Sequence, residues 1–598
     1  GLDIALGVLL LARFCGGFGG PVGRLVATVG VVALVGAAFG LRVDDSKAAA
    51  GVFRGRGASL PAGAEVVYAR DGKTATIHVV RYPGNHVAIA TNGKSDGAIN
   101  LDLVHGGPRR DEWTMTLLAA VPLLQHAGAR DVALIGYGTG LSTATATAAT
   151  WLTSIETIEI EPAMVEGARI FAPLTAAAYD DPRSHIVIED AKSYFARGAK
   201  RYDIIVAEPS NPWVSGVASL FSREFYASLR RYLHDDGIFV QWVHTYECDV
   251  ATVASILSAL QQTFPRFTLY EATAGDLLIV APADPATTLR FDPALLKAPA
   301  MAARMGRIAI DDVEQLRIRK VGSDASLRWL GRALGVPANS DYYPFVEIHA
   351  PQARLRGASA KSLTDVAAAP VPILEMLDGD APPADGVKLD AQSGSPREAQ
   401  LARANLALDA ILLPAAATAT GELQAAVQWA RVALLRCPQG PDAAPALSDD
   451  TPLLDAARAL AAGINPFVSA TRATALWRAV EAAPCHRARS PRLRTWLSLF
   501  GAVAARDAPA MSQLGRTLLQ ADPGAPPAAV EYALMAAMVG DHARGDGDGA
   551  RALFGAVMPR LQAGRDRSVL FVALSMWASR CRAATQPTPA SAPGDDGD

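Results

Sequence analysis

Short β-branched segments that alternate with helical segments are the feature that most limits how this chain can fold. DVALIGYGTG, ETIEIEP, HIVIED, YDIIVAEP and GIFVQWV follow one another at intervals of about 20 to 40 residues between positions 131 and 243. This rhythm is typical of a parallel β-sheet whose strands are joined by crossover helices. The predicted fold class of this region is therefore α/β, with ligands expected at the carboxyl ends of the strands.

Two further β-patterns flank the predicted parallel sheet. Upstream, EVVYARD, KTATIHVVRY and HVAIATNGK alternate apolar and polar residues and are bounded by the turn sequences DG, PGN and NG. They predict three antiparallel strands of a small sheet. Downstream, FTLYEATAGDLLIVAP predicts a hairpin at the end of the larger sheet.

At 598 residues the chain is too long for one hydrophobic core, so we expect several domains. An Ala-rich region near the C-terminus contains apparent helix pairs closed by proline at intervals of about 35 to 50 residues, which predicts degenerate helical-hairpin repeats. An irregular helical bundle is the alternative. The predicted division is a transmembrane helix pair at 1–45, a small β domain at 62–110, a Rossmann-like catalytic domain at 111–351, a linker at 352–400, an α-helical repeat-like domain at 401–582, and a disordered tail at 583–598.

The N-terminal region is strongly apolar. LDIALGVLLLA at 2–12 precedes LVATVGVVALVGAAFGL at 25–41, a run of 17 residues without charge, which is near the short limit for a membrane span. Since the first residue is glycine, we expect the tail of a longer membrane domain. A signal peptide is disfavoured, because Asp3 stands where a signal peptide would carry positive charge. Buried soluble helices are the other interpretation.

The charge distribution bears on location and partners. Basic residues after the second apolar run favour the inner membrane with the catalytic domain facing the cytoplasm. Lys plus Arg is 56 and Asp plus Glu is 59, which argues against nucleic acid as a partner. The five cysteines are scattered without CxxC spacing, so neither a disulfide framework nor a zinc site is predicted.

A glycine-rich turn ends the first predicted strand of the parallel sheet. In IGYGTG, Gly136, Gly138 and Gly140 would let the backbone approach a nucleoside. Glu159 ends the next strand, where it could accept hydrogen bonds from ribose hydroxyls, and Asp190 ends the third, where it could accept from an adenine amino group. A tight strand-to-helix turn and ordinary surface caps are the structural alternatives.

Glu208 follows the fourth strand, and the acids at successive strand ends form an acidic rim. The glycine turn IGYGTG is followed by neither GKS nor GKT, and the sequence has no basic cluster, which disfavours a nucleoside triphosphate. A neutral or positively charged adenosine derivative suits this rim better. His244, in WVHTYECD, could reach the same cleft, but the pattern favours an ordinary loop residue there.

In this order, IGYGTG, IEIEP, EDAKSYF, AEPSNPWVSGVASLFSREFY, GIFVQWV and NSDYYPFVEIHAP resemble the spermidine synthase (polyamine aminopropyltransferase) family. The similarity is greatest to bacterial members fused to an N-terminal membrane, transporter-like domain, and it covers roughly residues 62–351. The resemblance implies a methyltransferase-like Rossmann domain preceded by the small β domain.

It further implies a transferase that moves an aminopropyl group from decarboxylated S-adenosylmethionine to an amine in polyamine biosynthesis. The donor is a co-substrate, and no tightly bound cofactor or metal is expected. Glu208 matches the family's catalytic aspartate and would serve as the base, with partial desolvation beside Trp213 raising its pKa. Asp341, in NSDYYP, matches a recurrent acidic position and is predicted to help bind the substrate.

Several positions depart from the family pattern. Thr139 stands where the glycine turn usually carries an aspartate that pairs with the donor's ammonium group, and Asn211 stands where a second aspartate grips the acceptor. Thr114 and Met115 replace a Tyr-His pair, and Asp96 replaces a glutamine of the β domain. We therefore expect that adenosine recognition is retained while recognition of a cationic amine is weakened.

Two rival functions follow from these departures. Without the turn aspartate, intact S-adenosylmethionine becomes an admissible donor, and the protein could be a methyltransferase. A non-catalytic sensor that binds a nucleoside or a polyamine is the third hypothesis. The expected partners are a small-molecule amine, the membrane, and a protein bound through the C-terminal helices. The oligomeric state is left open, with a homodimer as one option.

Overall fold

The computed structural model divides the chain into two compact units, which are described separately. One comprises Gly1–Gly106 with Glu161–Ala168, and the other comprises Gly107–Ile160 with Arg169–Asp598. Apart from isolated positions before residue 20 and position 427, the described residues are 20–40, 44–51, 57–380, 384–391, 393–413, 429–436, 450–561 and 569–584.

The smaller unit is built on an antiparallel sheet with the order β1-β2-β3-β4. Asn92 and Gly93 lie in the left-handed region, with φ of 50° and 76°, as a tight hairpin turn requires. The predicted three strands are present, and a fourth, KSDGAIN, was missed because Asp96 and Gly97 give it a weak strand signature. The strands are β1 (Glu65–Asp71), β2 (Thr76–Tyr82), β3 (His86–Thr91) and β4 (Lys94–Asn100).

Helix α2 (Pro21–Gly40) covers most of the second apolar run of the N-terminal region. The first run, at 2–12, lies largely outside the described residues. Among the helices of the described part of the chain, none is long and apolar enough to cross a membrane. The predicted pair of membrane helices is therefore not found in the structure.

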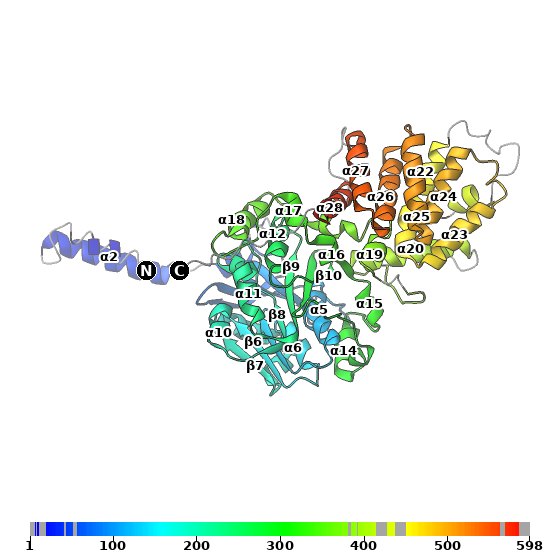
Figure 1. Cartoon of the computed structure of the whole chain (residues 1–598). Helices are drawn as coiled ribbons and strands as arrows, with labels where there is room; N and C mark the ends of the chain where they lie inside the picture. Colours follow the sequence, from blue (N-terminus) through cyan, green and yellow to red (C-terminus); the bar gives the residue numbers. More distant parts are fainter. Residues whose placement is uncertain are drawn as a thin grey trace, which may run out of the picture. The chain divides into compact units, whose positions relative to one another are not determined.

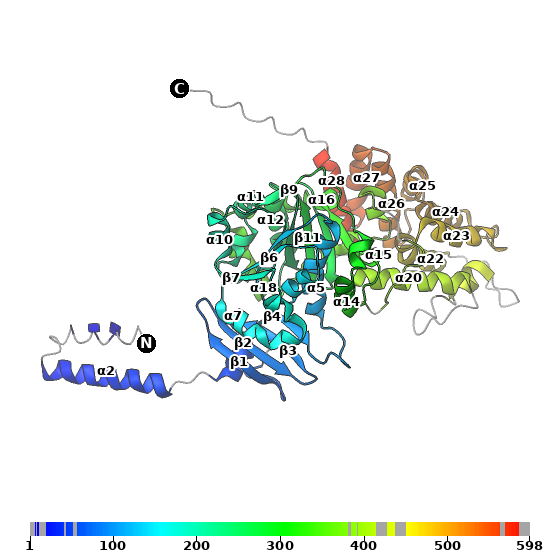
Figure 2. The same cartoon turned by 90° about the horizontal axis from the view of Figure 1, so that it is seen from below.

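The larger unit contains an eight-stranded sheet with the order β12-β10-β11-β9-β8-β5-β6-β7 (Figures 1 and 2). From β9 to β7 neighbouring strands are parallel, as the alternating pattern predicted, whereas β10, β11 and β12 pair antiparallel. The chain runs outward from β5 to β7 and then returns to β8 on the other side of β5. This sheet consists of β5 (Asp131–Ile135), β6 (Ser154–Glu159), β7 (Ser184–Ile188), β8 (Tyr202–Ala207), β9 (Leu233–His244), β10 (Thr268–Thr273), β11 (Asp276–Pro282) and β12 (Lys320–Ser323).

Alternate residues of the central strands enter two separate hydrophobic cores. In β5, Val132 and Leu134 pack with residues of α5 (Arg110–Gln125), whereas Ala133 and Ile135 belong to the other core. The second core includes residues of α11 (Arg223–Arg230) and α12 (Val250–Leu260). Because both faces are covered, the strands are apolar throughout rather than alternating.

The C-terminal region is a series of helices in which each helix from α23 to α28 contacts the next. The predicted helical character of this region is confirmed, while its division into repeats stays a prediction. The region comprises α20 (Pro396–Leu412), α22 (Thr451–Ile464), α23 (Ala470–Ala482), α24 (Pro491–Ala505), α25 (Ala508–Ala521), α26 (Pro527–Ala543), α27 (Gly547–Leu561) and α28 (Val569–Ala584).

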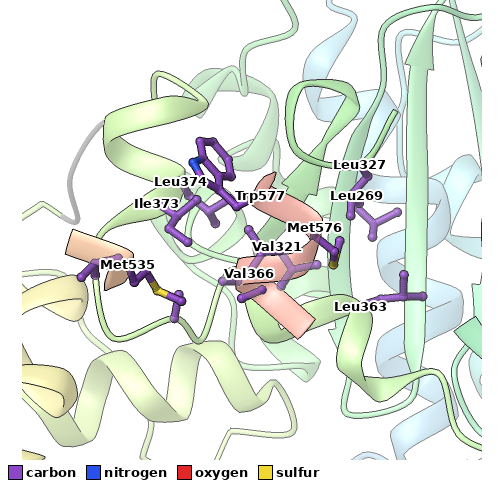
Figure 3. Close-up of a cluster of buried hydrophobic side chains, with 14 of the residues drawn as sticks. Leu269, Val321, Leu327, Leu363, Val366, Ile373, Leu374, Met535, Met576 and Trp577 are labelled. Atoms are coloured by element: carbon purple, nitrogen blue, oxygen red, sulfur yellow. The ribbon is translucent and has the colours of Figure 1, made fainter. Parts of the chain in front are cut away.

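Much of the segment expected to be a linker, 352–400, is instead packed into the core, whereas residues 384–391 are exposed or only partly buried. It contains η3 (Lys361–Val366) and α19 (Ile373–Leu377), whose apolar side chains are buried. Figure 3 shows Met576 and Trp577 of α28 beside Val321, Val366 and Leu374. The sequence pattern was misleading because contacts with distant segments, rather than local periodicity, order these residues.

A buried ion pair joins the start of α20 to the strands at the sheet edge. Arg319 and Glu398 lie 2.6 Å apart with side chains only 2% and 3% exposed. The Arg319 guanidinium also donates to the Ala272 carbonyl, and the Glu271 carboxylate accepts from Ser395 and from the Arg397 amide. These contacts fix the beginning of the helical region to β10.

One cysteine forms a disulfide, although no disulfide framework was predicted. Cys485 is disulfide-bonded, whereas Cys248 and Cys581 carry thiols, so its partner lies outside the described residues. Sequence spacing did not indicate this bond because a disulfide requires proximity in space, which distant cysteines can reach in the fold.

Replacing Glu398 tests how much the buried ion pair with Arg319 contributes to the free energy of unfolding. We expect Glu398→Ala to lower the free energy of unfolding by about 3 to 5 kcal/mol, because Arg319 would remain buried without its counter-charge. The measurement is the shift in the denaturant midpoint, followed by circular dichroism. Asp548→Ala is the control, since the pair of Asp548 with Arg551 is exposed and should contribute no more than about 1 kcal/mol. Equal effects of the two variants would contradict the interpretation.

Candidate functional site

The glycine turn lies where the strand order reverses, between β5 and β8. Gly136, Gly138 and Gly140 have φ of 96°, 52° and 80°, values that favour glycine. A Cβ atom on Gly136 would lie 2.3 Å from the Glu208 carbonyl oxygen. The turn after β5 and the residue after β8 are thus in direct backbone contact, which only glycine at position 136 allows.

Two of the predicted nucleoside-binding acids are held by backbone amides. Glu159 ends β6, is 7% exposed, and accepts a 2.9 Å hydrogen bond from the Tyr137 amide of the glycine turn. Asp190 lies beyond β7 and caps α10 (Ala191–Arg197), accepting from the Ser193 amide at 2.8 Å. Glu159 therefore contacts the turn and Asp190 caps a helix, while the binding of a nucleoside by either acid stays a prediction.

Glu208 follows β8 directly and is partly buried, and the surrounding protein desolvates its carboxyl group. The Ser142 hydroxyl of α6 (Leu141–Thr147) donates to Oε2 at 2.6 Å. The pKa of Glu208 is raised to about 7, first by burial and then by the negative charges of Asp276 and Asp111, while the Ser142 bond acts in the opposite direction. A carboxyl group of this kind can accept and release a proton near neutral pH.

Asp276 is a second buried acid of this region that sequence reasoning missed. It accepts from Trp242 Nε1 at 3.1 Å, Thr114 Oγ1 at 3.2 Å and Thr273 Oγ1 at 2.8 Å. Burial raises its pKa. The acidic rim was predicted from the carboxyl ends of parallel strands, but β11 runs antiparallel, so its first residue pairs with His244 at the carboxyl end of β9. The turn sequence AGD before an apolar strand is the signal that could have identified it.

The positions that depart from the family pattern are turned into the protein. Thr139 is fully buried, and its hydroxyl lies 3.0 Å from the Met115 sulfur. Asn211 is fully buried as well, with its Nδ2 atom 3.2 Å from His244 Nδ1. Residues at positions that the resemblance assigns to amine recognition therefore contact one another or their neighbours in the interior.

His244 lies among aromatic side chains. Its ring centroid is 4.7 Å from that of Trp213, 5.2 Å from that of Trp242 and 4.7 Å from that of Tyr246. The residue is 2% exposed and is the last of β9, so the expectation of a loop residue was wrong. In the described part of the chain, Asn211 Oδ1 and Trp213 Nε1 are buried without a hydrogen-bond partner.

The remaining predicted substrate-binding residues form ion pairs. Asp96 belongs to the smaller unit, where it pairs with Lys94 at 2.8 Å. Asp341 precedes α18 (Phe345–Leu355) and pairs with Lys192 of α10 at 2.9 Å. A substrate-binding role for either acid stays a prediction.

One group of side chains has the composition of a metal site. The candidate ligand atoms of His126, Asp203 and Asp236 lie within 4.8 Å of one another. Asp203 already accepts from the amides of Arg130 and Asp131 at the amino end of β8. The cluster therefore lies at the sheet edge opposite Glu208, with one of its carboxylates engaged in holding the backbone.

Comparisons with known proteins find similar sequences over the region that contains this site. Residues 113–275 match the family model of the spermine/spermidine synthase domain. Polyamine aminopropyltransferase 1 of Pseudomonas aeruginosa is 30% identical over 198 residues, which is 33% of this chain and 69% of that protein. The polyamine aminopropyltransferase of Escherichia fergusonii is 35% identical over 142 residues, 23% of this chain and 49% of its own length. The spermidine synthase structure from Thermotoga maritima is 22% identical, with a TM-score of 0.33, covering 39% of this chain and 78% of that one.

The raised pKa of Glu208 predicts a pH-dependent cost in stability. Its ordinary value is 4.5 and its folded value about 7, so ionisation in the folded state is unfavourable. The cost is absent below pH 4.5, grows as the pH rises towards 7, and is constant above it. We expect Glu208→Gln to be more stable than the unmodified protein at pH 8 by about 1 to 2 kcal/mol, with no advantage at pH 4.5.

Denaturant unfolding at both pH values measures this difference. Glu314→Gln removes a carboxylate from the surface of α15 (Val313–Arg317) and serves as the control, with an expected effect within about 0.5 kcal/mol. A Glu208→Gln protein that is less stable at pH 8 would contradict the prediction.

Proposed function

The chain belongs to the polyamine aminopropyltransferase (spermidine synthase) family, and we propose that it transfers an aminopropyl group to an amine acceptor with Glu208 as the base. Decarboxylated S-adenosylmethionine is the donor that the family uses. The observation that carries the proposal is the desolvated Glu208 carboxyl group, bonded to Ser142 and placed directly against the glycine turn.

The chemistry requires a neutral amine next to an electrophilic carbon. The amine lone pair forms a new C–N bond while the C–S bond of the sulfonium donor breaks, and the electron pair remains on sulfur as methylthioadenosine. Glu208 accepts the proton that the nitrogen loses. A base whose pKa is about 7 is partly ionised at neutral pH and is therefore suited to this transfer.

Donor binding is proposed at the glycine turn. Glu159 is fixed there by the Tyr137 amide, and an acid in this position suits ribose hydroxyls. Thr139 brings no carboxylate to the turn, so neither attraction for the donor's ammonium group nor repulsion of a carboxylate arises from it. This observation keeps methyl transfer from intact S-adenosylmethionine as the second candidate function.

The acceptor is proposed to be an amine recognised with fewer ionic contacts than in the family pattern. Asn211 Oδ1 offers a buried hydrogen-bond acceptor for an N–H group, and Trp213 Nε1 offers a buried donor. Neither group carries charge. A diamine whose second ammonium group needs a carboxylate at position 211 is therefore expected to bind weakly.

We also propose a location at the inner membrane with the catalytic domain on the cytoplasmic side. The support is the uncharged run at 25–41 and the basic residues that follow it, Arg42, Lys47, Arg54 and Arg56. The C-terminal helices are proposed to bind a protein partner, because stacked helix pairs build an extended surface. Fractionation of cells tests the location: sedimentation of the full chain with the inner membranes at low salt is expected, and its complete recovery in the soluble fraction would contradict the proposal.

A product assay tests the transferase directly. With decarboxylated S-adenosylmethionine and a panel of monoamines and diamines, we expect release of methylthioadenosine, measured by liquid chromatography. Glu208→Gln should lower the rate by about 100-fold or more, because it removes the base. Asp235→Asn, whose side chain is 88% exposed, is the control and should retain full activity.

The competing functions give different results in the same assay. Methyl transfer would produce S-adenosylhomocysteine from the intact donor and would show tighter binding of that donor by calorimetry. A non-catalytic sensor would bind the nucleoside without releasing any product. Absence of methylthioadenosine with every amine would overturn the aminopropyl assignment.

A further inference from the structure

We propose that Ser142 is a positioning residue that holds Glu208 in both of its protonation states by reversing the hydrogen bond between them. The proposal rests on the proposed function, in which Glu208 takes up the proton of the amine. It assigns a role to a residue that the sequence patterns did not single out.

The geometry offers the Ser142 hydroxyl two acceptors. Its Oγ atom lies 2.6 Å from Glu208 Oε2 and 3.1 Å from the carbonyl oxygen of Met115. A hydroxyl group has one proton and can direct it at only one of these acceptors at a time. Ser142 is 2% exposed and lies in the first turn of α6, so water has little access to the hydroxyl.

The two acceptors correspond to two states of the site. When Glu208 is ionised, Ser142 donates to its carboxylate. When Glu208 has taken the proton from the amine on Oε2, the new O–H group rotates about its C–O bond and donates to Ser142 Oγ, and the hydroxyl proton of Ser142 turns to the Met115 carbonyl. No proton passes through Ser142, and both states keep Glu208 bonded to the same atom.

Neighbouring hydroxyl groups of α6 are engaged elsewhere. Thr143 bonds the hydroxyl of Thr157 at 2.9 Å, and Thr145 donates to the Leu141 carbonyl at 2.8 Å. The side chains of Thr143 and Thr145 are buried, like that of Ser142, but their hydroxyl groups bond other residues than Glu208. Thr145 therefore provides a matched control for the loss of a buried hydroxyl from the same helix.

The hydrogen bond from Ser142 to Glu208 opposes the effect of the negative charges near Glu208. The negative charges of Asp276 of β11 and Asp111 of α5 both disfavour the ionised form of Glu208. The positive charge of Arg110 of α5 favours the ionised form of Asp276. The Ser142 bond favours the ionised form of Glu208. Removing the hydroxyl should therefore raise the pKa of Glu208 further.

The first test is the pH dependence of the transfer rate in the full chain. For Ser142→Ala we expect the acid limb of the profile to move up by about one pH unit, because the charge-assisted bond that the ionised carboxylate loses is stronger than the neutral bond that the protonated carboxyl group loses. This is about a tenfold loss of rate below the midpoint and a smaller loss at high pH. Ser142→Thr should restore the midpoint, and Thr145→Val should leave it unchanged.

A second readout does not depend on any substrate. Infrared titration of the protonated carboxyl band, with Glu208→Gln used to assign the band, measures the midpoint of Glu208 directly. If the unmodified protein releases no product with any amine, the proposed function fails, but this titration still decides the role of Ser142. An unchanged midpoint in folded Ser142→Ala, or no recovery in Ser142→Thr, would overturn the proposal.

A variant that cannot fold does not prevent the test. If Ser142→Ala gives no soluble protein, Ser142→Cys retains a side chain of similar size with a weaker donor. Its midpoint should then move in the same direction by a smaller amount. A downward shift would contradict the proposed direction of the hydrogen bond.

Discussion

The site depends on the backbone contact between the turn after β5 and the residue after β8. The Glu208 amide donates to the Ile135 carbonyl at 2.9 Å, and the Glu208 carbonyl oxygen lies so close to Gly136 that a side chain there would collide with it. This contact occurs where the strand order reverses, which is where an open α/β sheet leaves room for a ligand. Gly136 and the Glu208 carboxyl group are therefore parts of one arrangement.

Buried acids around this contact determine its chemistry. Glu208 follows the carboxyl end of the parallel strand β8, and Asp276 is the first residue of the antiparallel strand β11. The pKa values of both acids are raised because burial disfavours their charged forms. Hydroxyl groups compensate part of that cost, Ser142 for Glu208 and Thr114 with Thr273 for Asp276. A site of this composition favours proton transfer near neutral pH over the binding of a fixed charge.

Beyond the site, the helical region is integrated into the same unit as the sheet. The Arg319–Glu398 pair and the apolar contacts of α28 attach it to the strands at the sheet edge. The turn that precedes Asp276 also receives a contact from this direction, since the Ala274 amide donates to the Gly394 carbonyl at 3.1 Å. Through Gly394 and Glu398, the segment that was predicted to be a linker thus contacts both the turn before Asp276 and the strands at the sheet edge.

The sequence by itself determined the parallel strands, the glycine turn, and the acids Glu159 and Glu208. These follow from local patterns: β-branched runs form strands, and a glycine turn has a recognisable spacing. Only the tertiary structure decided that the side chains of Thr139 and Asn211 are buried and that aromatic rings surround His244. It also decided that Asp276 lies near enough to Glu208 to raise its pKa. Those features join residues far apart in the chain, and burial and hydrogen bonding in the folded state set them, so no local pattern could have shown them.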